Sequence, residues 1–280
     1  MKYTLLIEGH TITLCADGNA STIAEFSSYT NKYELGGERH SPSDVIIKAE
    51  FVPGWGNENR SNANEIEMED GQIVRVEMNR ILASGTLTRA GHGFAGKFKL
   101  NGDGPDPIDG VVSFCLSLLC EESGELLLHS SAVTQDDHAY LFLGHGGAGK
   151  TTIAVELNGG RTPLSVDRTL VAFDEDGTAI AHSTPFGDRN HDLSGPGKAP
   201  IAGIFFIEQA DEHRILPVDP FEATRLILAQ TIAPTRSRAT VQKVMDAVGK
   251  LVDLGCCYKL RFKKDDGFWP LIDEALAGRK

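Results

Sequence analysis

The sequence predicts a two-part α/β protein, in which a smaller β-rich domain precedes a mixed sheet with helices. In the first third of the chain, short apolar runs alternate with glycines and polar clusters, a pattern typical of strands and tight turns. After a stretch rich in glycine and proline, longer apolar segments indicate helices that alternate with strands. One apolar strand leads into a glycine-rich loop and a helix. We therefore predict domains at residues 1–108 and 109–280.

The N-terminal third is expected to be built from strands and loops. Two apolar segments flank Glu8-Gly9-His10, which favours a tight hairpin turn. The stretch N-G-D-G-P-D-P-I-D-G at 101–110 concentrates turn-forming residues, so we expect no regular element there and interpret it as the linker between the domains. We predict strands at 4–7, 11–14, 45–52 and 73–78, short strands broken by glycine at 90–99, and a long polar loop at 53–64.

The C-terminal part is expected to alternate helices and strands. The apolar run at 111–120 predicts a buried helix, and Gly124 is the residue type that ends one. We predict further helices at 151–157, 220–230 and 240–252, and strands at 126–133, 139–144, 164–166, 170–173 and 201–207.

Charge and composition exclude several classes of protein. The chain has 27 Lys and Arg against 39 Asp and Glu, a net charge of −12, and no block of basic residues, so a nucleic-acid partner is not expected. No apolar run approaches the roughly 20 residues needed to span a bilayer, and the N-terminus lacks the apolar core of a secretory signal. The odd number of cysteines, without a C-x-x-C pair, favours reduced thiols in a cytoplasmic protein. These are Cys15, Cys115, Cys120, Cys256 and Cys257.

The strongest signal is G-H-G-G-A-G-K-T, which has the pattern of a phosphate-binding P-loop. A triphosphate needs several donors that converge on its oxygens, and a glycine-rich backbone can supply its N–H groups at close range. A lysine at the end of the loop reaches the β- and γ-phosphates, and the following hydroxyl can bind Mg²⁺. We therefore predict ATP and Mg²⁺ as cofactors. The nucleotide-binding residues are expected to be Gly144, His145, Gly146, Gly147, Ala148, Gly149, Lys150, Thr151 and Thr152.

Two classes of P-loop protein fit the sequence poorly. A GTPase should carry N-K-x-D for the guanine base, but the only N-K, at Asn31-Lys32, lies far upstream and is followed by Tyr33-Glu34. An ABC-type ATPase should carry an L-S-G-G-Q-like signature, and the stretch at 193–197 imitates it only weakly because Pro196 and Gly197 would break the helix that follows such a signature.

The residues around the loop carry a family resemblance. His129 opens H-S-S-A-V upstream of the loop, and Asp167 stands in L-S-V-D-R-T-L-V downstream of it. This arrangement resembles the HPr kinase/phosphorylase family, which is related to the ATP-dependent phosphoenolpyruvate carboxykinases, and in particular its uncharacterised members from peptide-modification gene clusters. The resemblance covers residues 125–175 well and extends loosely to the C-terminus, but it does not cover 1–110. It implies an HPr-kinase-like P-loop fold for the second domain.

The resemblance also implies roles for individual residues. Lys150 and Thr151 match the phosphate-binding lysine and the Mg²⁺-binding hydroxyl, and His129 matches a histidine near the reacting phosphate. Asp167 matches one of two neighbouring family aspartates, of which one binds the metal and the other takes the hydroxyl proton. Its own neighbours are Val166 and Arg168, so one acid of that pair is absent here. The implied catalytic residues are Asp167, His129 and Lys150, and the implied metal ligands are Thr151 and Asp167.

Simpler interpretations of these side chains remain open. His129 lies in an apolar stretch and would also suit a hydrogen-bonded core position, and Asp167 would also suit a turn after a strand. If Asp167 belongs to the site, we expect its strand to end beside the loop in a parallel sheet. Asp188, Arg189 and His191 form a polar cluster in which an arginine could reach a phosphate, but a solvated loop fits as well.

Two functions follow from the sequence. The first is an ATP/Mg²⁺-dependent phosphotransferase acting on a hydroxyl of a small protein, a peptide or a small molecule, with serine as the expected acceptor. The second is a non-catalytic nucleotide-binding accessory protein of a peptide-modification pathway. The intact Lys150-Thr151 pair favours the first, and the absent second acid favours the alternative. Neither a nucleic acid nor a membrane is an expected partner, and a homo-oligomer is possible.

Overall fold

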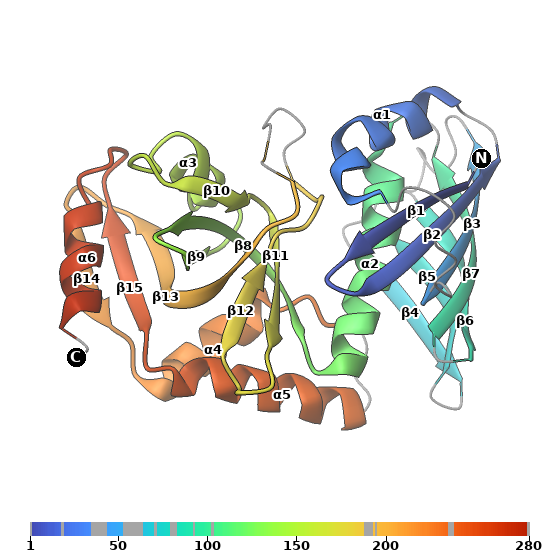
Figure 1. Ribbon diagram of the computed structural model, residues 1–280. Helices are drawn as coiled ribbons and strands as arrows, with labels where there is room; N and C mark the ends of the chain where they lie inside the picture. Colours follow the sequence, from blue (N-terminus) through green and yellow to red (C-terminus); the bar gives the residue numbers. More distant parts are fainter. Residues whose placement is uncertain are drawn as a thin grey trace. The chain divides into compact units, whose positions relative to one another are not determined.

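The protein is described from a computed structural model, in which the chain forms two compact units (Figure 1). Unit 1 comprises Met1–Leu119 with Pro234–Ser237, and unit 2 comprises Cys120–Ala233 with Arg238–Lys280. The predicted domain boundary after residue 108 lies within the helix that crosses from unit 1 to unit 2, and it stays a prediction. The structure describes residues 2–17, 20–34, 44–52, 64–69, 72–78, 83–91, 93–101, 104–187, 193, 195–234 and 238–278.

Unit 1 is built on a seven-stranded sheet with the strand order β1-β2-β3-β7-β6-β5-β4. The predicted hairpin at its edge is confirmed: Glu8 and Gly9 form the turn with φ angles of 44° and 79°, and β1 pairs with β2 in antiparallel register. The strand β3 pairs in parallel with both β2 and β7. The strands are β1 (Lys2–Ile7), β2 (His10–Asp17), β3 (Val45–Val52), β4 (Asn64–Glu69), β5 (Gln72–Met78), β6 (Ala83–Ala90) and β7 (Gly93–Asn101).

The helices of unit 1 differ from the sequence-based expectation in two ways. The β-rich interpretation missed α1 (Ala20–Thr30) and the short 3-10 helix η1 (Asn31–Tyr33). The expectation of an irregular linker at 101–110 is wrong, because α2 spans Asp106–Ser123 and includes part of that stretch. Pro107 lies in the first turn of α2, where a missing N–H breaks no helical hydrogen bond, so the proline does not prevent the helix. At its other end, Gly124 has a φ of 79° and ends the helix as predicted.

Unit 2 contains an eight-stranded mixed sheet. Its main order is β10-β8-β11-β12-β13-β15-β14, and β9 lies between β8 and β13, antiparallel to the first and parallel to the second. Because β13 also pairs in parallel with β15, the carboxyl ends of β9, β13 and β15 lie at one edge of the sheet. The strands are β8 (Leu126–Gln135), β9 (His138–Leu143), β10 (Thr162–Ser165), β11 (Arg168–Phe173), β12 (Ala179–His182), β13 (Lys198–Gln209), β14 (Arg214–Pro217) and β15 (Cys257–Phe262).

Among its described residues, unit 2 has four helices, which cover its apolar core. The helix α3 packs on β8, β9 and β10, while α4 and α5 pack against each other and against β8 (Figure 1). The core includes the fully buried rings of Phe142 and Phe205, which stack with centroids 5.5 Å apart. The helix α4 begins at an Asp219 N-cap whose carboxylate accepts two backbone N–H groups. The helices are α3 (Lys150–Val155), α4 (Pro220–Gln230), α5 (Arg238–Asp253) and α6 (Trp269–Ala277).

Most of the predicted elements of unit 2 are confirmed with small shifts of their ends, whereas β12, β14, β15 and α6 were not predicted. Residues 90–99 form the end of β6 and most of β7 instead of several short strands. The predicted loop at 53–64 lies outside the described residues except for Asn64, which begins β4. Within the described part of the chain, every helix is too short or too polar to cross a membrane.

Candidate functional site

The centre of the candidate site is the glycine loop, which we define as residues 144–149. It connects the carboxyl end of β9 to α3, so the predicted order of strand, loop and helix is confirmed. The side chains of β9 before the loop are fully buried at Leu141, Phe142 and Leu143, whereas the loop residues His145, Gly146 and Gly147 are exposed. The buried strand therefore anchors a loop whose backbone is open to solvent.

Two glycines of the loop are required by its backbone geometry. Gly147 and Gly149 have φ angles of 80° and 106°, a conformation that other residues rarely adopt. A Cβ atom at Gly149 would also lie 2.9 Å from Cζ of Phe262, at the end of β15. At Gly146, by contrast, a Cβ atom would meet nothing within 4 Å, and its φ angle is not positive. The sequence of the loop thus suits a tight turn that passes close to the neighbouring strand.

Lys150 folds back over the loop that precedes it. Its Nζ atom donates hydrogen bonds to the carbonyl oxygens of Gly144, at 2.7 Å, and His145, at 3.2 Å. The residue is only 7% exposed. Burial lowers the pKa of Lys150 below its usual value, and the nearby charge of Asp167 partly opposes this change. Its backbone carbonyl accepts a hydrogen bond from the Oγ of Ser131 on β8, which fixes the start of α3 against the sheet.

Thr151 and Thr152 follow in the first turn of α3. The Oγ1 atom of Thr151 donates to the backbone carbonyl of Val166 at 3.4 Å, so the helix meets the turn between β10 and β11. Thr152 is half-buried, and its carbonyl accepts the N–H groups of Glu156 and Leu157 at the end of the helix. Thr151 is therefore directed towards the turn that carries Asp167, whereas the described contacts of Thr152 lie within its own helix.

Asp167 lies in the turn between β10 and β11, and both of its carboxylate oxygens face a nitrogen. Oδ1 is 3.2 Å from Nε2 of His129 on β8, and Oδ2 is 3.3 Å from Nη1 of Arg168. Burial alone would raise the pKa of Asp167, but the hydrogen bond from His129 and the charges of Arg168, His129 and Lys150 together lower it below its usual value. Asp167 therefore persists as a carboxylate at neutral pH.

Antiparallel pairing places Asp167 beside the loop, so the expected parallel arrangement is wrong. Both β10 and β11 pair antiparallel with β8. Arg168 lies opposite His129 in that register, and the amide of Ser130 donates to the carbonyl of Asp167 at 3.1 Å. The long strand β8 thus carries His129 and Ser131 within reach of the turn and of α3.

The structure adds contacts that sequence analysis did not anticipate. Nε2 of Gln209, at the end of β13, donates to the carbonyl of Gly147 at 3.1 Å. The guanidinium of Arg168 lies over the ring of Phe186, 5.3 Å from its centroid, and the carbonyl of Arg168 accepts a 2.6 Å hydrogen bond from Thr184. The sequence carries no local signal for Gln209, because its contact requires β9 and β13 to be neighbours in the sheet. The candidates Asp188, Arg189 and His191 lie outside the described residues.

The oxygen atoms near the loop fit the ligand preference of Mg²⁺, whereas the positive charge of Arg168 opposes a metal ion at Asp167. Mg²⁺ binds through one or two carboxylate or hydroxyl oxygens together with phosphate and water, and Thr151 and Asp167 supply such oxygens on adjoining segments. Arg168, however, holds a positive charge next to Oδ2 of Asp167, where a second cation would be repelled.

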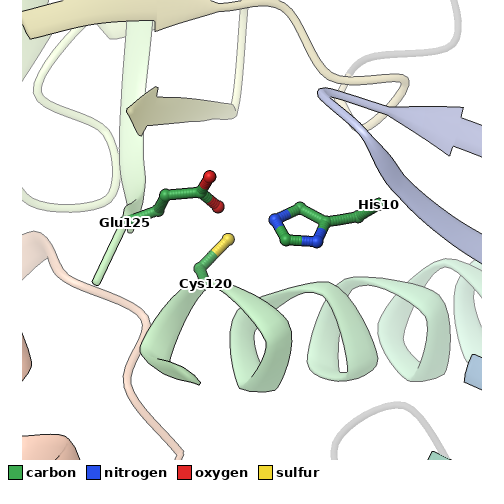
Figure 2. Close-up of side chains that lie close together, drawn as sticks. All are labelled: His10, Cys120 and Glu125. Carbon is green, nitrogen blue, oxygen red and sulfur yellow. The ribbon is translucent and has the colours of Figure 1, made fainter. Parts of the chain in front are cut away.

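A second group of reactive side chains lies at the start of unit 2, away from the glycine loop in sequence. Figure 2 shows the thiol of Cys120, at the end of α2, close to the carboxylate of Glu125, just before β8. Burial, and then the charge of Glu125, raise the pKa of the Cys120 thiol well above its usual value. His10, also drawn there, belongs to unit 1. The thiol of Cys120 is thus held in its neutral form.

A family model matches the greater part of the chain. The model described as "SynChlorMet cassette protein ScmC" matches residues 111–277. The chain belongs to the ScmC family. The matched segment contains His129, the glycine loop and Asp167, so every described residue of the candidate site lies within the ScmC match, while residues 1–110 lie outside it. The description as a cassette protein agrees with the expected resemblance to members of gene clusters.

Comparison with solved structures gives a match for part of this ScmC protein. The HPr(Ser) kinase/phosphatase from Coxiella burnetii matches with a TM-score of 0.27 and 12% sequence identity, over 54% of this chain and 93% of that chain. No curated protein matches the sequence. Membership of the ScmC family over residues 111–277 is therefore what relates this chain to known proteins.

Proposed function

We propose that this protein is an ATP/Mg²⁺-dependent phosphotransferase that transfers the γ-phosphoryl group to a hydroxyl. The observation that carries this proposal is the meeting of three groups at one place: Lys150 at the end of the glycine loop, Thr151 bonded to the β10–β11 turn, and Asp167 of that turn paired with His129 of β8. A phosphate-binding loop beside a histidine–carboxylate pair supplies both functions that phosphoryl transfer to a hydroxyl requires.

The glycine loop would hold the phosphates of the nucleotide. Its exposed backbone can offer N–H groups to phosphate oxygens, and Gly147 and Gly149 let it turn closely around them. Lys150 now donates to two carbonyls of the loop, and these contacts would be exchanged for charge-assisted bonds to the β- and γ-phosphates. Since burial already lowers the pKa of Lys150 and so disfavours its charged form, a phosphate partner would stabilise that charge.

Thr151 and Asp167 would hold Mg²⁺ when the nucleotide binds. The ion would supply charge neutralisation on the phosphate oxygens. The protein's own groups would position the acceptor hydroxyl and take its proton. Both oxygens of Asp167 already have partners and its pKa is lowered, which makes it a weak base. His129 is 39% exposed, and with Nε2 donating to Asp167 its Nδ1 would be free to accept a proton.

The acceptor oxygen forms a bond to the γ-phosphorus while the bond between that phosphorus and the bridging oxygen of ADP breaks. The hydroxyl proton moves to His129, and Asp167 stabilises the resulting imidazolium. We propose a serine of a small protein or peptide as the acceptor, and the description of the ScmC family as a cassette protein supports a search for it among the products of the same cassette. We expect the reaction to occur in the cytoplasm, in keeping with the reduced and mostly buried cysteines.

The absence of a second acid beside Asp167 favours a second function. Asp167 is flanked by Val166 and Arg168 and is paired with Arg168, so one acid of the expected pair is absent and proton transfer falls to His129 alone. This arrangement also suits a protein that binds ATP without transferring phosphate, and that uses the nucleotide to order a surface for a peptide or an enzyme of the same cassette. Such an accessory protein would need Lys150 but not His129.

The experiment that separates the two functions is label transfer from [γ-³²P]ATP. The full chain is incubated with Mg²⁺, labelled ATP and each peptide encoded in the same cassette, and Lys150→Ala and Lys243→Ala variants are run alongside. The phosphotransferase proposal expects label in one peptide with wild type and with the exposed control Lys243→Ala, but not with Lys150→Ala. ATP binding without any label transfer would support the accessory protein, and absence of ATP binding would overturn both.

A further inference from the structure

Arg168 follows Asp167 directly in the chain and lies against its carboxylate. Its Nη1 atom lies 3.3 Å from Oδ2 of Asp167, and the side chain remains 25% exposed. The other oxygen of Asp167 faces His129. The carboxylate that was expected to bind a metal is therefore already neutralised by a fixed cation from its own neighbour in the chain.

Several contacts hold Arg168 in this position. Its guanidinium lies 5.3 Å from the centroid of the fully buried ring of Phe186, and a cation over an aromatic face is attracted to it. Its backbone carbonyl accepts the hydroxyl of Thr184, and its strand pairs with β8 opposite His129. A Cβ atom at Gly187 would come within 2.3 Å of Val166, so the segment after β12 packs tightly on this turn. Arg168 is thus a preorganised group of the site.

Position and charge together indicate what this side chain can bind. A guanidinium has five N–H donors in a planar fork that matches phosphate geometry, and the contact with Asp167 uses one edge of the fork. Lys150 lies close enough to Asp167 for the two charges to influence each other. Because Oγ1 of Thr151 also donates to the carbonyl of Val166, the two cations Lys150 and Arg168 lie on adjoining segments beside the end of the glycine loop.

We propose that Arg168 binds the terminal phosphate of the nucleotide and supplies part of the charge neutralisation that Mg²⁺ would otherwise provide, so that nucleotide binding depends only weakly on the metal. Besides the roles proposed for it above, Asp167 then orients Arg168 through its Oδ2 atom. This inference rests on the proposed function, because it assumes that the glycine loop binds a nucleoside triphosphate. It gives Arg168 a role that the sequence pattern did not assign.

The test is a calorimetric titration of the full chain with ATP, once in excess Mg²⁺ and once in EDTA. For wild type we expect the dissociation constants in the two conditions to differ by less than about tenfold. In Arg168→Gln, the uncompensated carboxylate of Asp167 repels the phosphate unless Mg²⁺ screens it. We therefore expect affinity to fall by roughly 10- to 100-fold in EDTA and by clearly less in Mg²⁺. Arg168→Lys keeps the charge without the fork and should lie between the two, while Arg225→Gln on the exposed face of α4 serves as the control.

The possible outcomes separate this inference from the proposed function. Wild-type binding that vanishes in EDTA would overturn the role of Arg168 even if no variant folds, since that measurement needs only the native protein. Equal metal dependence in wild type and a folded Arg168→Gln, judged by circular dichroism, would overturn it as well. If wild type binds ATP in neither condition, the proposed function fails and the inference fails with it.

Discussion

The Nε2 atom of His129 lies 3.2 Å from the Oδ1 atom of Asp167, although one residue belongs to a long strand before the glycine loop and the other to a turn after it. The contact is supported by the backbone, because the amide of Ser130 donates to the carbonyl of Asp167. A pair held by both main chain and side chains keeps its geometry when one side chain is changed conservatively. Substitution at either residue therefore probes chemistry more than folding.

The first prediction concerns this pair. Asp167→Asn keeps the size of the side chain but removes the carboxylate that would stabilise a charged His129, and His129→Gln removes the proton acceptor itself. We expect either change to lower phosphoryl transfer by roughly 10²–10⁴-fold while ATP affinity in His129→Gln stays near wild type. Single-turnover transfer assays and calorimetry measure the two effects. Asp136→Asn, in the exposed β8–β9 turn, is the control. Wild-type transfer by His129→Gln would remove the histidine from the mechanism.

The second prediction concerns the lysine of the glycine loop. Lys150→Ala removes the ammonium group proposed to bind the phosphates, so we expect the free energy of ATP binding to weaken by about 1.5–3 kcal/mol. Lys243→Ala, on the surface of α5, should leave affinity unchanged. Isothermal titration of the three proteins decides the matter, and equal affinity of wild type and Lys150→Ala would contradict the proposed nucleotide site.

The third prediction compares two glycines of the same loop. Gly149→Ala combines a φ of 106° with a Cβ atom 2.9 Å from Phe262, so we expect a loss of roughly 1–3 kcal/mol in the free energy of unfolding. Gly146→Ala meets nothing within 4 Å and should change stability by less than about 0.5 kcal/mol. Urea unfolding of both variants provides the comparison. Equal stability of the two would mean that the loop does not hold this conformation in solution.

The fourth prediction concerns the thiols. Burial raises the pKa of Cys115 and of Cys120. Both thiols therefore stay neutral in the folded protein at a pH at which exposed thiols begin to ionise. Because the folded state favours the neutral thiol, its contribution to the free energy of unfolding is fully present at a pH below the pKa of the thiol in the unfolded chain. This contribution is lost progressively as the pH rises above about 9. With iodoacetamide at pH 8 we expect the half-buried Cys15 to react first, and Cys115 and Cys120 only after unfolding, as read by mass spectrometry. Early labelling of Cys115 would contradict its burial.

The local sequence pattern is sufficient to predict some elements of the fold. The strand at 45–52 and the helix at 220–230 were predicted with their observed ends, because alternation and an aspartate–proline start are local signals. The glycine loop was located for the same reason. The functional roles of Asp167, His129 and Lys150 stay predictions.

Other features depend on distant parts of the chain. The antiparallel pairing that brings Asp167 to His129 follows from strand register, which a single sequence does not specify. The contact of Gln209 with Gly147 likewise requires β9 and β13 to be neighbours. In α2, helix packing prevailed over the turn preference of the residues around Pro107, since a proline in the first turn costs no hydrogen bond. Sequence thus indicated the reactive groups and missed the contacts that orient them.

The tryptophan of the C-terminal helix α6 can serve as a fluorescence probe of the candidate site. The indole N–H of Trp269 donates to the carbonyl of Leu157, just beyond α3, and Arg161 lies over the ring, 3.6 Å from its centroid. The chain has two tryptophans, Trp55 and Trp269. A Trp55→Phe protein would therefore emit from a single indole coupled to the helix that begins at Lys150. Its fluorescence would report movement of that helix in real time, without a label, as a ligand enters the glycine loop.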